Sequence, residues 1–408
     1  MASTEAMPQI ELAQWTERIH RSELQNVLTG TKPAISFALG LPAPELFPVT
    51  DIAEAVEEVL RVDRSALQYG PPSLELKEQV VELMKWRRVA VKTGQVFLTS
   101  GAQQGLSLLA RLLLNPGGRV LCDELAYSGF QQAVSVLTPQ IQTVRSGSDT
   151  GIDSQAIEQL LVAGMRPAFI YAMSEGHNPL SVSMSARDRE RLARIAARFS
   201  VPVVEDDAYG FLQYESDGLL PMRGYEERWV LYVGSFSKIL CPSFRVGWLI
   251  VPEELQSNLA ILKEASDIDT STFCQKVICA YLRMGRLKSH ISALRTEYRQ
   301  RRDAMLEALA QHFPDGSRWS RPAGGVFIWV EMPAHINTSH LLRASLSSEG
   351  IAFLPGSAFA MGDVPGATNC MRLNFSHACI QDIQSGIERL GRLSREFADR
   401  RRVGATVM

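Results

Sequence analysis

Several features are scarce in this 408-residue sequence, and each scarcity argues against a class of protein. The six cysteines form no Cys-x-x-Cys pair and the seven histidines form no His-Glu-x-x-His pattern, so neither a disulfide framework nor a zinc site is indicated. The chain has no run of about 18 apolar residues, and its first residues lack the basic and apolar regions of a secretion signal. We therefore expect a cytoplasmic protein that holds no metal and does not enter a membrane.

An excess of charge of one sign is also lacking. The 42 lysines and arginines face 44 aspartates and glutamates, which leaves a formal net charge of -2. Such a surface offers no long-range attraction to nucleic acid or anionic lipid, so neither is expected as a partner. The length and the 46% share of hydrophobic residues are enough for two or three domains with a large core.

Short apolar runs alternate with helical patterns in the first two thirds of the chain. This alternation predicts an α/β fold with a mainly parallel sheet covered by helices on both faces. One of the helices is marked by Ser185 and Asp188, which read as a capping box, followed by apolar residues at helical spacing up to Phe199. The expected strands lie at 95–99, 118–123, 167–173, 201–207, 229–235 and 246–251.

The remaining pattern predicts a second, smaller α+β domain. We place the large domain at residues 45–286 and the small domain at 287–408, where helices are mixed with strand-like runs. Residues 1–44, with an amphipathic helix from Trp15 to Leu28, are too few for a core of their own. We expect this N-terminal segment to pack on the small domain.

Lys238 is the most informative residue, because it directly follows an apolar strand. An amine at that place can form a Schiff base with a carbonyl cofactor, and Ser235, Ser237 and Arg245 can donate hydrogen bonds to a phosphate group nearby. The alternative is an exposed loop lysine without a chemical role.

Two further segments favour an anionic cofactor. The sequence SGAQQG (100–105) follows a strand and opens a helix, whose first backbone N–H groups can bind an anion, although most such turns only cap a helix. The strand at 201–207 ends in Asp206 and Asp207, with Tyr209 after them. A carboxylate there can keep a pyridine nitrogen protonated, but an acidic pair at a strand end is also an ordinary turn.

The set of motifs resembles the fold-type I pyridoxal-phosphate enzymes, specifically the class I/II aminotransferases and their branch with 2-aminoadipate and kynurenine aminotransferases. The resemblance covers residues 35–376 and rests on ordered motifs. They are SFALGLPAPELFP, LQYG, TSGAQQGL, AYSG, HNP, EDDAY, GSFSK with its arginine, GGVFIW, FLPGSAF and MRLNFS.

The resemblance implies a role for each matching residue. Lys238 would be the Schiff-base lysine that also moves the substrate proton, and Asp206 would pair with the pyridine nitrogen, because the family spacing D-x-x-Y fits Asp206 and Tyr209. Tyr209 and Asn178 would bind the 3′ oxygen of pyridoxal 5′-phosphate, and Tyr127 would stack on its ring.

The same resemblance assigns the phosphate and the substrate carboxylate. Tyr69 would reach the phosphate of the neighbouring subunit, which implies a homodimer with shared active sites. Arg372 would bind the α-carboxylate of the substrate, assisted by Asn178 and by the close approach of Gly40. The phosphate site would consist of Ser100, Gly101, Ala102, Gln103, Ser235, Ser237 and Arg245.

The sequence departs from the family pattern in three places. Relatives read N-P-T-G where this chain has Asn178-Pro-Leu-Ser, and His177 stands where glutamine is usual. We expect His177 to be a surface histidine of the loop, with a general acid or base as the alternative. The turn after LQYG is replaced by PPSLE, and Ser22 and Glu23 stand near the place where aminoadipate-type relatives have an arginine.

The function expected from these motifs is transamination of an L-amino acid, with a 2-oxo acid as the second substrate. The alternative is a pyridoxal-phosphate enzyme that does not transaminate, namely a lyase, synthase, β/γ-replacement enzyme, oxidase or racemase. The altered loops keep this alternative open. A third interpretation, the effector domain of a transcription regulator, needs a helix-turn-helix domain for which the N-terminal segment has no room.

Overall fold

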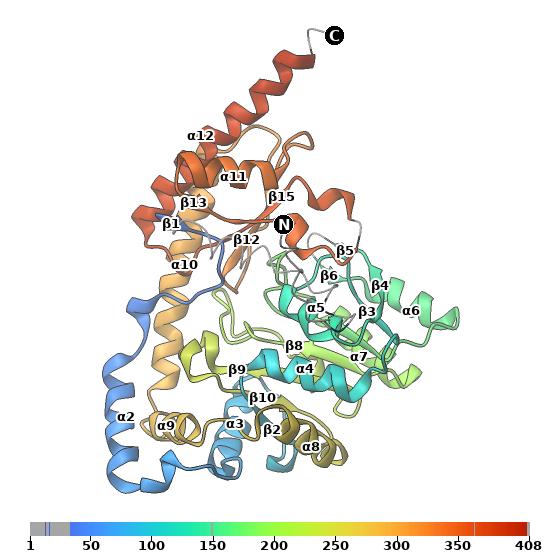
Figure 1. Cartoon of the computed structure of the whole chain (residues 1–408), viewed down its shortest axis with the longest axis vertical. Helices are drawn as coiled ribbons and strands as arrows, with labels where there is room; N and C mark the ends of the chain where they lie inside the picture. Colours follow the sequence, from blue (N-terminus) through green and yellow to red (C-terminus); the bar gives the residue numbers. More distant parts are fainter. Residues whose placement is uncertain (1–12, 14–15, 17–32, 148–149, 363, 406–408) are drawn as a thin grey trace, which may run out of the picture.

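The computed structural model describes residues 13, 16, 33–147, 150–362 and 364–405, and a seven-stranded sheet lies at its centre (Figure 1). Every neighbouring pair of strands is parallel except the two that involve β10, which runs against both β9 and β2. The predicted α/β fold with a mainly parallel sheet is therefore confirmed. In spatial order the strands are β2 (Val96–Thr99), β10 (Gly247–Ile250), β9 (Val230–Ser235), β8 (Val203–Asp206), β7 (Phe169–Ala172), β3 (Arg119–Asp123) and β4 (Gln140–Val144).

The strand β4 is the member of this sheet that the sequence did not predict. It lies at the edge, where its first residues, Gln140 and Ile141, are exposed. A half-exposed edge strand carries no continuous apolar run, whereas the six predicted strands are buried and carry one.

Both faces of the central sheet are buried, because successive side chains of a strand point to opposite faces. Leu121 belongs to one core cluster, and its neighbours Val120 and Cys122 belong to the other. The first cluster packs under α6 (Ser154–Val162) and α7 (Ala186–Phe199), and the second packs under α4 (Ala102–Leu113) and α5 (Ser128–Ser135).

Helix α7 begins where the sequence predicted. The Ser185 hydroxyl accepts a hydrogen bond from the Asp188 N–H at 3.1 Å, which satisfies one free donor of the first turn. Leu192 and Ile195 are buried against the sheet, and Phe199 is partly buried there. The predicted cap and apolar face are both confirmed.

The structure contains a second sheet, which has four antiparallel strands. Its order is β11 (Arg318–Trp319), β12 (Phe327–Glu331), β15 (Cys370–Asn374) and β14 (Leu354–Pro355), with α10 (Leu287–His312), α11 (Thr338–Ser348) and α12 (Ile380–Ala405) beside it. Near the start of the described chain, β1 (Ile35–Ser36) pairs with β13 (Ile351–Ala352). The exact domain limits stay predictions, and the helix predicted from Trp15 to Leu28 lies outside the described residues.

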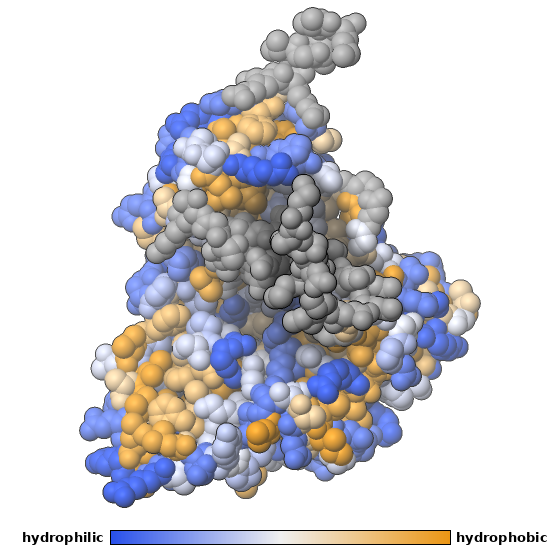
Figure 2. Space-filling view, in the orientation of Figure 1, coloured by the Kyte–Doolittle hydropathy of each residue, from blue (hydrophilic) through white to orange (hydrophobic). Residues whose placement is uncertain are grey.

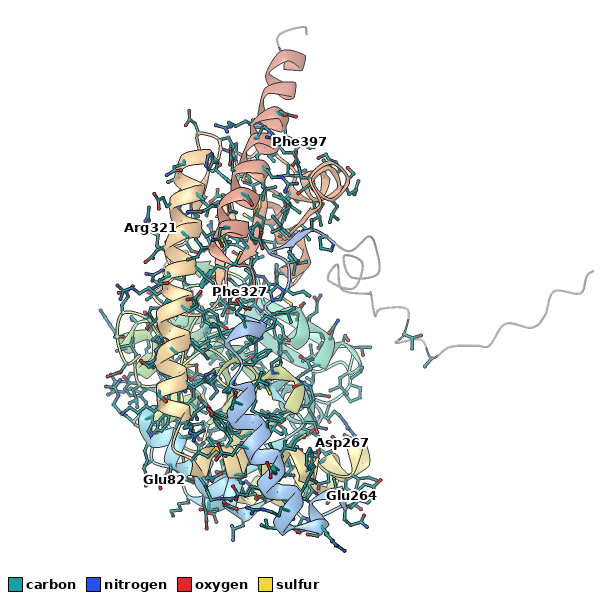
Figure 3. The ribbon with its side chains drawn as sticks, turned by 90° about the vertical axis from the view of Figure 1, so that its left-hand side faces the viewer. Glu82, Glu264, Asp267, Arg321, Phe327 and Phe397 are labelled. Atoms are coloured by element: carbon teal, nitrogen blue, oxygen red, sulfur yellow. The ribbon has the colours of Figure 1, made fainter. Side chains whose placement is uncertain are left out.

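The remaining helices lie in the lower part of Figure 1, around strands β2 and β10 of the central sheet. They are α2 (Val49–Val62), α3 (Leu74–Trp86), α8 (Gln256–Asp267) and α9 (Thr272–Arg283). Elsewhere, β5 (Ser146–Gly147) and β6 (Gly151–Ile152) form a small antiparallel hairpin. Figure 3 shows α10 running upward from the level of α9, and its upper part packs beside α12. No helix among the described residues is both long and apolar enough to cross a lipid bilayer.

Candidate active site

A cavity of about 300 Å³ lies at the carboxyl ends of the central strands, where loops from different strands meet. The small sheet closes it with Phe327, Leu354 and Arg372. Most of the residues that the sequence singles out line this one cavity. They are Gly40, Ala102, Gln103, Tyr127, Asn178, Asp206, Tyr209, Ser235, Ser237, Lys238, Arg245 and Arg372.

Lys238 ends the short helix that follows β9, which places its amine in the cavity. Its Nζ donates a hydrogen bond to the carbonyl oxygen of Gly40 at 2.6 Å. Burial lowers the pKa of Lys238 from 10.5 to about 8, and the positive charges of Arg372 and Arg245 add to this effect. A larger share of the amine is therefore neutral and nucleophilic near pH 7 than in an exposed lysine.

Asp206 and Asp207 have different surroundings although they are adjacent. Asp206 lines the cavity, and its Oδ2 accepts a hydrogen bond from the Tyr171 hydroxyl at 2.9 Å, while its buried Oδ1 has no partner. Burial raises the pKa of Asp206 to about 6, although the Tyr171 bond opposes this. Asp207 instead contacts Arg87 at 3.1 Å and Tyr232 at 2.9 Å, away from the cavity.

Two tyrosines present their rings to the cavity. Tyr127 packs so closely on Gly129 that a Cβ at this glycine would stand 2.4 Å from the ring. Tyr209 lies edge-on to Phe327, with the ring centres 5.9 Å apart. Burial raises the pKa of both hydroxyls, so both phenols stay protonated and can donate hydrogen bonds.

The start of α4 lies at the cavity, where its free N–H groups can bind an anion. Gly101 caps this helix with a φ of +86°, a conformation that favours glycine, and a Cβ there would stand 2.8 Å from Nη2 of Arg245. The first N–H groups of α4, those of Ala102 and Gln103, and the Arg245 guanidinium thus converge from two segments.

Three predicted residues do not line the cavity. The Ser100 hydroxyl points away and donates to Asp267 at 2.7 Å, so its side chain supports the turn from behind. Gly101 contributes only its backbone conformation. Tyr69 is 78% exposed on the surface of the protein.

Arg372 is buried and held from several sides. Its Nη1 donates to Oδ1 of Asn178 at 2.7 Å, and its Nη2 donates to the carbonyl oxygen of Ala38 at 2.6 Å. The guanidinium carbon lies 3.8 Å from the centre of the Phe327 ring and 4.8 Å from that of Phe359. Burial lowers its pKa to about 10, so Arg372 is still positively charged at neutral pH, and its Nε has no partner.

The prediction that His177 lies on the surface was wrong. The side chain is buried, and its Nε2 lies 3.1 Å from Oδ2 of Asp123. Sequence reasoning placed it on the surface because the HNPLS segment has turn composition, but this turn folds inward between β3 and the cavity. Ser181 has a φ of +61°, a left-handed conformation that favours glycine.

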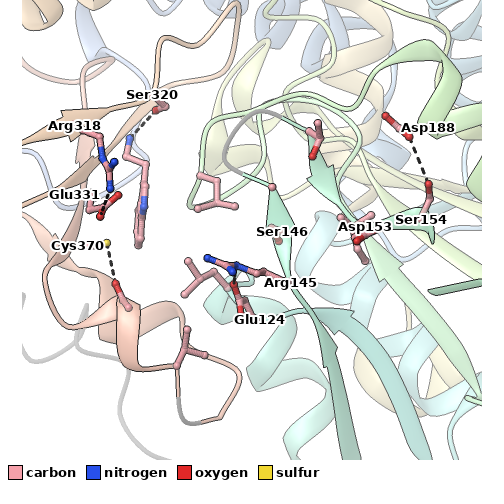
Figure 4. Close-up of a pocket in the computed structure, with 18 of the residues that line it drawn as sticks. Glu124, Arg145, Ser146, Asp153, Ser154, Asp188, Arg318, Ser320, Glu331 and Cys370 are labelled. Atoms are coloured by element: carbon pink, nitrogen blue, oxygen red, sulfur yellow. Dashed lines mark hydrogen bonds and ion pairs between the residues drawn. The ribbon is translucent and has the colours of Figure 1, made fainter. Parts of the chain in front are cut away.

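A larger cavity of about 930 Å³ lies beside the first, between the β5–β6 hairpin and the small sheet. Figure 4 shows Arg145 and Glu124 on one wall, facing Arg318 and Glu331 on the other. Arg318 donates to Glu331 at 2.8 Å, so part of this charge is already paired. None of the residues that line the smaller cavity also lines this one.

Comparisons with known proteins identify the family. The family model described as aminotransferase class I and II matches residues 35–390. The chain belongs to this family.

The relatives agree with this assignment. The aromatic-amino-acid aminotransferase 1 of Thermococcus litoralis is 36% identical over 386 residues, with 92% of each chain covered. The 2-aminoadipate transaminase of Thermus thermophilus is 35% identical, with 92% of this chain and 94% of the relative covered. The solved structure of LysN, the alpha-aminoadipate aminotransferase of Thermus thermophilus in complex with N-(5'-phosphopyridoxyl)-L-leucine, superposes with a TM-score of 0.88 at 32% identity and covers 95% of this chain and 98% of its own.

The predicted family, its fold-type I architecture and its transamination of amino acids are thus confirmed, and pyridoxal 5′-phosphate is the cofactor. The cavity fits this group at both of its ends. The unpartnered, buried Oδ1 of Asp206 can receive a ring N–H, and the start of α4 with Arg245 can receive a phosphate. Lys238 lines the same cavity, and the lowered pKa of its amine, about 8, suits attack on the cofactor aldehyde.

Sequence reasoning missed several residues that support the aminotransferase site. Tyr171, which donates a hydrogen bond to Asp206, lies in the apolar strand β7. The only sign of this role in the sequence is a polar hydroxyl group within an apolar run. Phe359 packs on Arg372, but its position depends on the segment between β14 and β15. Asp123 ends β3 and resembles any acidic residue at a strand end. Each of them acts through contacts between distant segments, which one sequence does not display.

Proposed function

We propose that this aminotransferase moves the amino group of an uncharged L-amino acid to a 2-oxo acid, with Lys238, Asp206 and Arg372 in the central roles. The observation that carries this proposal is the convergence of all three residues on one cavity. When bound, pyridoxal phosphate supplies the aldehyde that condenses with the amino group and the ring that accepts the electron pair from Cα.

Three residues of the chain have separate roles in binding and proton transfer. Arg372 is positioned to bind the substrate carboxylate, with Nε free and with Asn178 and Ala38 fixing the plane of the guanidinium. Lys238 is the group that takes the proton from the substrate Cα and returns it at the cofactor carbon. Asp206 holds the ring nitrogen protonated with its opposite charge.

The lining of the cavity favours a substrate whose side chain is uncharged. The remaining wall is largely apolar and includes Leu39, Leu41 and Met173, in addition to Phe327 and Leu354. Each charged residue among the described lining has a role toward the cofactor or the α-carboxylate, so none is left for a second carboxylate. These charged residues are Asp206, Lys238, Arg245 and Arg372.

We further propose that the enzyme is a homodimer that works in the cytoplasm. Exposed apolar residues of α2, such as Val49 and Val62, lie on the surface that leads to Leu67 and Tyr69, and Figure 2 shows apolar residues gathered over α2 and α9. This surface supports a contact through which Tyr69 reaches the neighbouring site. The six cysteines are unpaired, which agrees with a reducing compartment.

A single-turnover experiment tests the proposed reaction. Enzyme loaded with cofactor is mixed with a panel of amino acids and no 2-oxo acid, and the products are counted. An aminotransferase should release one 2-oxo acid per active site and then stop, because the amino group stays on the enzyme. Continuing turnover without an acceptor would contradict transamination, and a preference for acidic amino acids would contradict the proposed substrate class.

A further inference from the structure

His177 occupies the inside of the loop that carries Asn178. The loop from His177 to Val182 is closed by its own backbone, because the His177 N–H donates to the Val182 carbonyl at 2.8 Å and the Ser181 N–H donates to the His177 carbonyl at 2.5 Å. Asn178 leaves this loop toward the cavity and accepts the hydrogen bond from Arg372. The orientation of Arg372 therefore depends on the position of the loop.

The imidazole connects this loop to the central sheet through both of its nitrogens. Its Nδ1 accepts a hydrogen bond from the Leu180 N–H at 3.3 Å, and its Nε2 lies 3.1 Å from Oδ2 of Asp123, at the end of β3. A backbone N–H can only donate, so Nδ1 must accept and the ring proton is on Nε2. Asp123 is in turn fixed by a hydrogen bond from the Ser146 hydroxyl.

The imidazole and the residues that it contacts directly are shielded from water, so solvent cannot replace a lost partner. His177, Asp123, Asn178 and Leu180 are 1%, 0%, 3% and 7% exposed. If the imidazole were removed, the Leu180 N–H and Oδ2 of Asp123 would both lose their partner, and only Oδ1 of Asp123 would keep one, the Ser146 hydroxyl.

We infer that His177 is a positioning residue, which ties the Asn178 loop to Asp123 and thereby sets the orientation of Arg372 for the substrate carboxylate. The inference rests on the proposed role of Arg372. It also explains the departure from the family pattern: the amide of glutamine has one acceptor and one donor group, so it can satisfy Leu180 and Asp123 as the imidazole does. The histidine therefore replaces glutamine without changing what the position does.

The test compares four substitutions. His177→Leu removes both hydrogen bonds, and His177→Gln restores a donor and an acceptor. His177→Asn supplies the same groups on a side chain too short to span Leu180 and Asp123, and it retains a polar residue in case the leucine variant fails to fold. Ser183→Ala is the matched control, because the Ser183 hydroxyl also accepts a backbone N–H, that of Gly176 at 3.1 Å, but lies outside the closed loop.

Two quantities are measured for each protein. The KM for the amino acid and for the 2-oxo acid should rise about tenfold in His177→Leu and His177→Asn, with a smaller change in kcat, because carboxylate binding is weakened. Hydrogen exchange of the Leu180 amide in the cofactor-free protein should become faster in the same two variants. His177→Gln should restore both quantities to within about threefold of the wild type, and Ser183→Ala should leave both unchanged.

The inference is overturned if the KM of His177→Leu and His177→Asn stays within about twofold of the wild type, or if His177→Gln behaves like them. Loss of transamination in the wild type itself would contradict the proposed function instead. In that case the exchange rates of the Leu180 amide would still test whether His177 holds the loop.

Discussion

At the scale of single residues, the end of β8 shows how burial and partners give two adjacent carboxylates different tasks. Burial raises the pKa of both carboxyls, and each has one oxygen without a partner, but Asp206 lines the cavity whereas Asp207 forms an ion pair with Arg87 outside it. The sequence alone did not show which aspartate pairs with the ring nitrogen, and only the family spacing D-x-x-Y assigned this role to Asp206. The packing of Arg87 against Asp207, which joins segments 120 residues apart, is what separates them.

Substitution of each aspartate by asparagine should separate activity from stability. Asp206→Asn should lower kcat by about a hundredfold or more with the fold intact, because the ring nitrogen loses its counter-charge. Asp207→Asn should instead lower the free energy of unfolding by about 2 kcal/mol, because buried Arg87 loses the nearer of its two carboxylates and keeps only Glu175, at 3.6 Å. Steady-state kinetics and urea unfolding measure the two effects, and the larger loss of kcat in Asp207→Asn would reverse the assignment.

The stability of the cofactor-free protein should depend on pH through Asp206. Burial raises the pKa of this carboxyl from 3.8 to about 6, so the folded protein binds more protons than the unfolded chain between these values. The free energy of unfolding should therefore fall by about 3 kcal/mol as the pH rises through this interval. Asp206→Asn should lack this part of the fall, while other groups such as Glu205 titrate in both proteins. Parallel stability curves for the two proteins would show that Asp206 has an ordinary pKa.

At the scale of secondary-structure elements, the start of α5 is shaped by the cavity. Gly129 lies against the Tyr127 ring, and a Cβ there would also stand 2.3 Å from Oε1 of Gln103. Gly129→Ala should therefore displace the ring and weaken cofactor binding at least about tenfold, with a loss of about 1–3 kcal/mol in the free energy of unfolding. Gly366→Ala is the control, because no atom lies within 4 Å of a Cβ at that position. Equal dissociation constants for the cofactor in both variants, measured by titration, would contradict this account of Tyr127.

Elements with strong local signals were predictable, and elements that depend on distant partners were not. The six buried strands carry apolar runs, and Ser185 carries its own capping signal, so both were found from the sequence. The edge strand β4 and the inward fold of His177 were missed, because an edge position and the contact with Asp123 arise only from the packing of other segments. The side chain of Ser100 was expected in the phosphate site, but Asp267 from α8 holds it outside.

At the scale of the whole molecule, a shared active site is the main consequence of the proposed dimer. Tyr69 is exposed and does not line the cavity of its own chain, so its role requires a second subunit. A homodimer would also cover apolar residues such as Val62 and Leu67.

Mixing two damaged subunits tests this arrangement. Lys238→Ala and Tyr69→Ala homodimers should each have low activity, but a mixed dimer would contain one site with the intact lysine and the intact partner tyrosine. After subunit exchange, the mixture should therefore regain up to about a quarter of the wild-type activity, since half of the dimers are mixed and each has one intact site. Activity no higher than the mean of the separate variants would contradict a shared site, and a protein that sediments as a monomer would exclude it.

The central claim is that the cavity around Lys238 is the active site of this aminotransferase, and locating the attached cofactor tests it most directly. Borohydride reduction fixes the cofactor to the lysine nitrogen that holds it, after which peptide mass mapping identifies the residue. We predict that the added mass lies on the peptide with Lys238 and is absent in Lys238→Ala, a variant that should still fold. Attachment to any other lysine, or unchanged attachment in Lys238→Ala, would contradict the account.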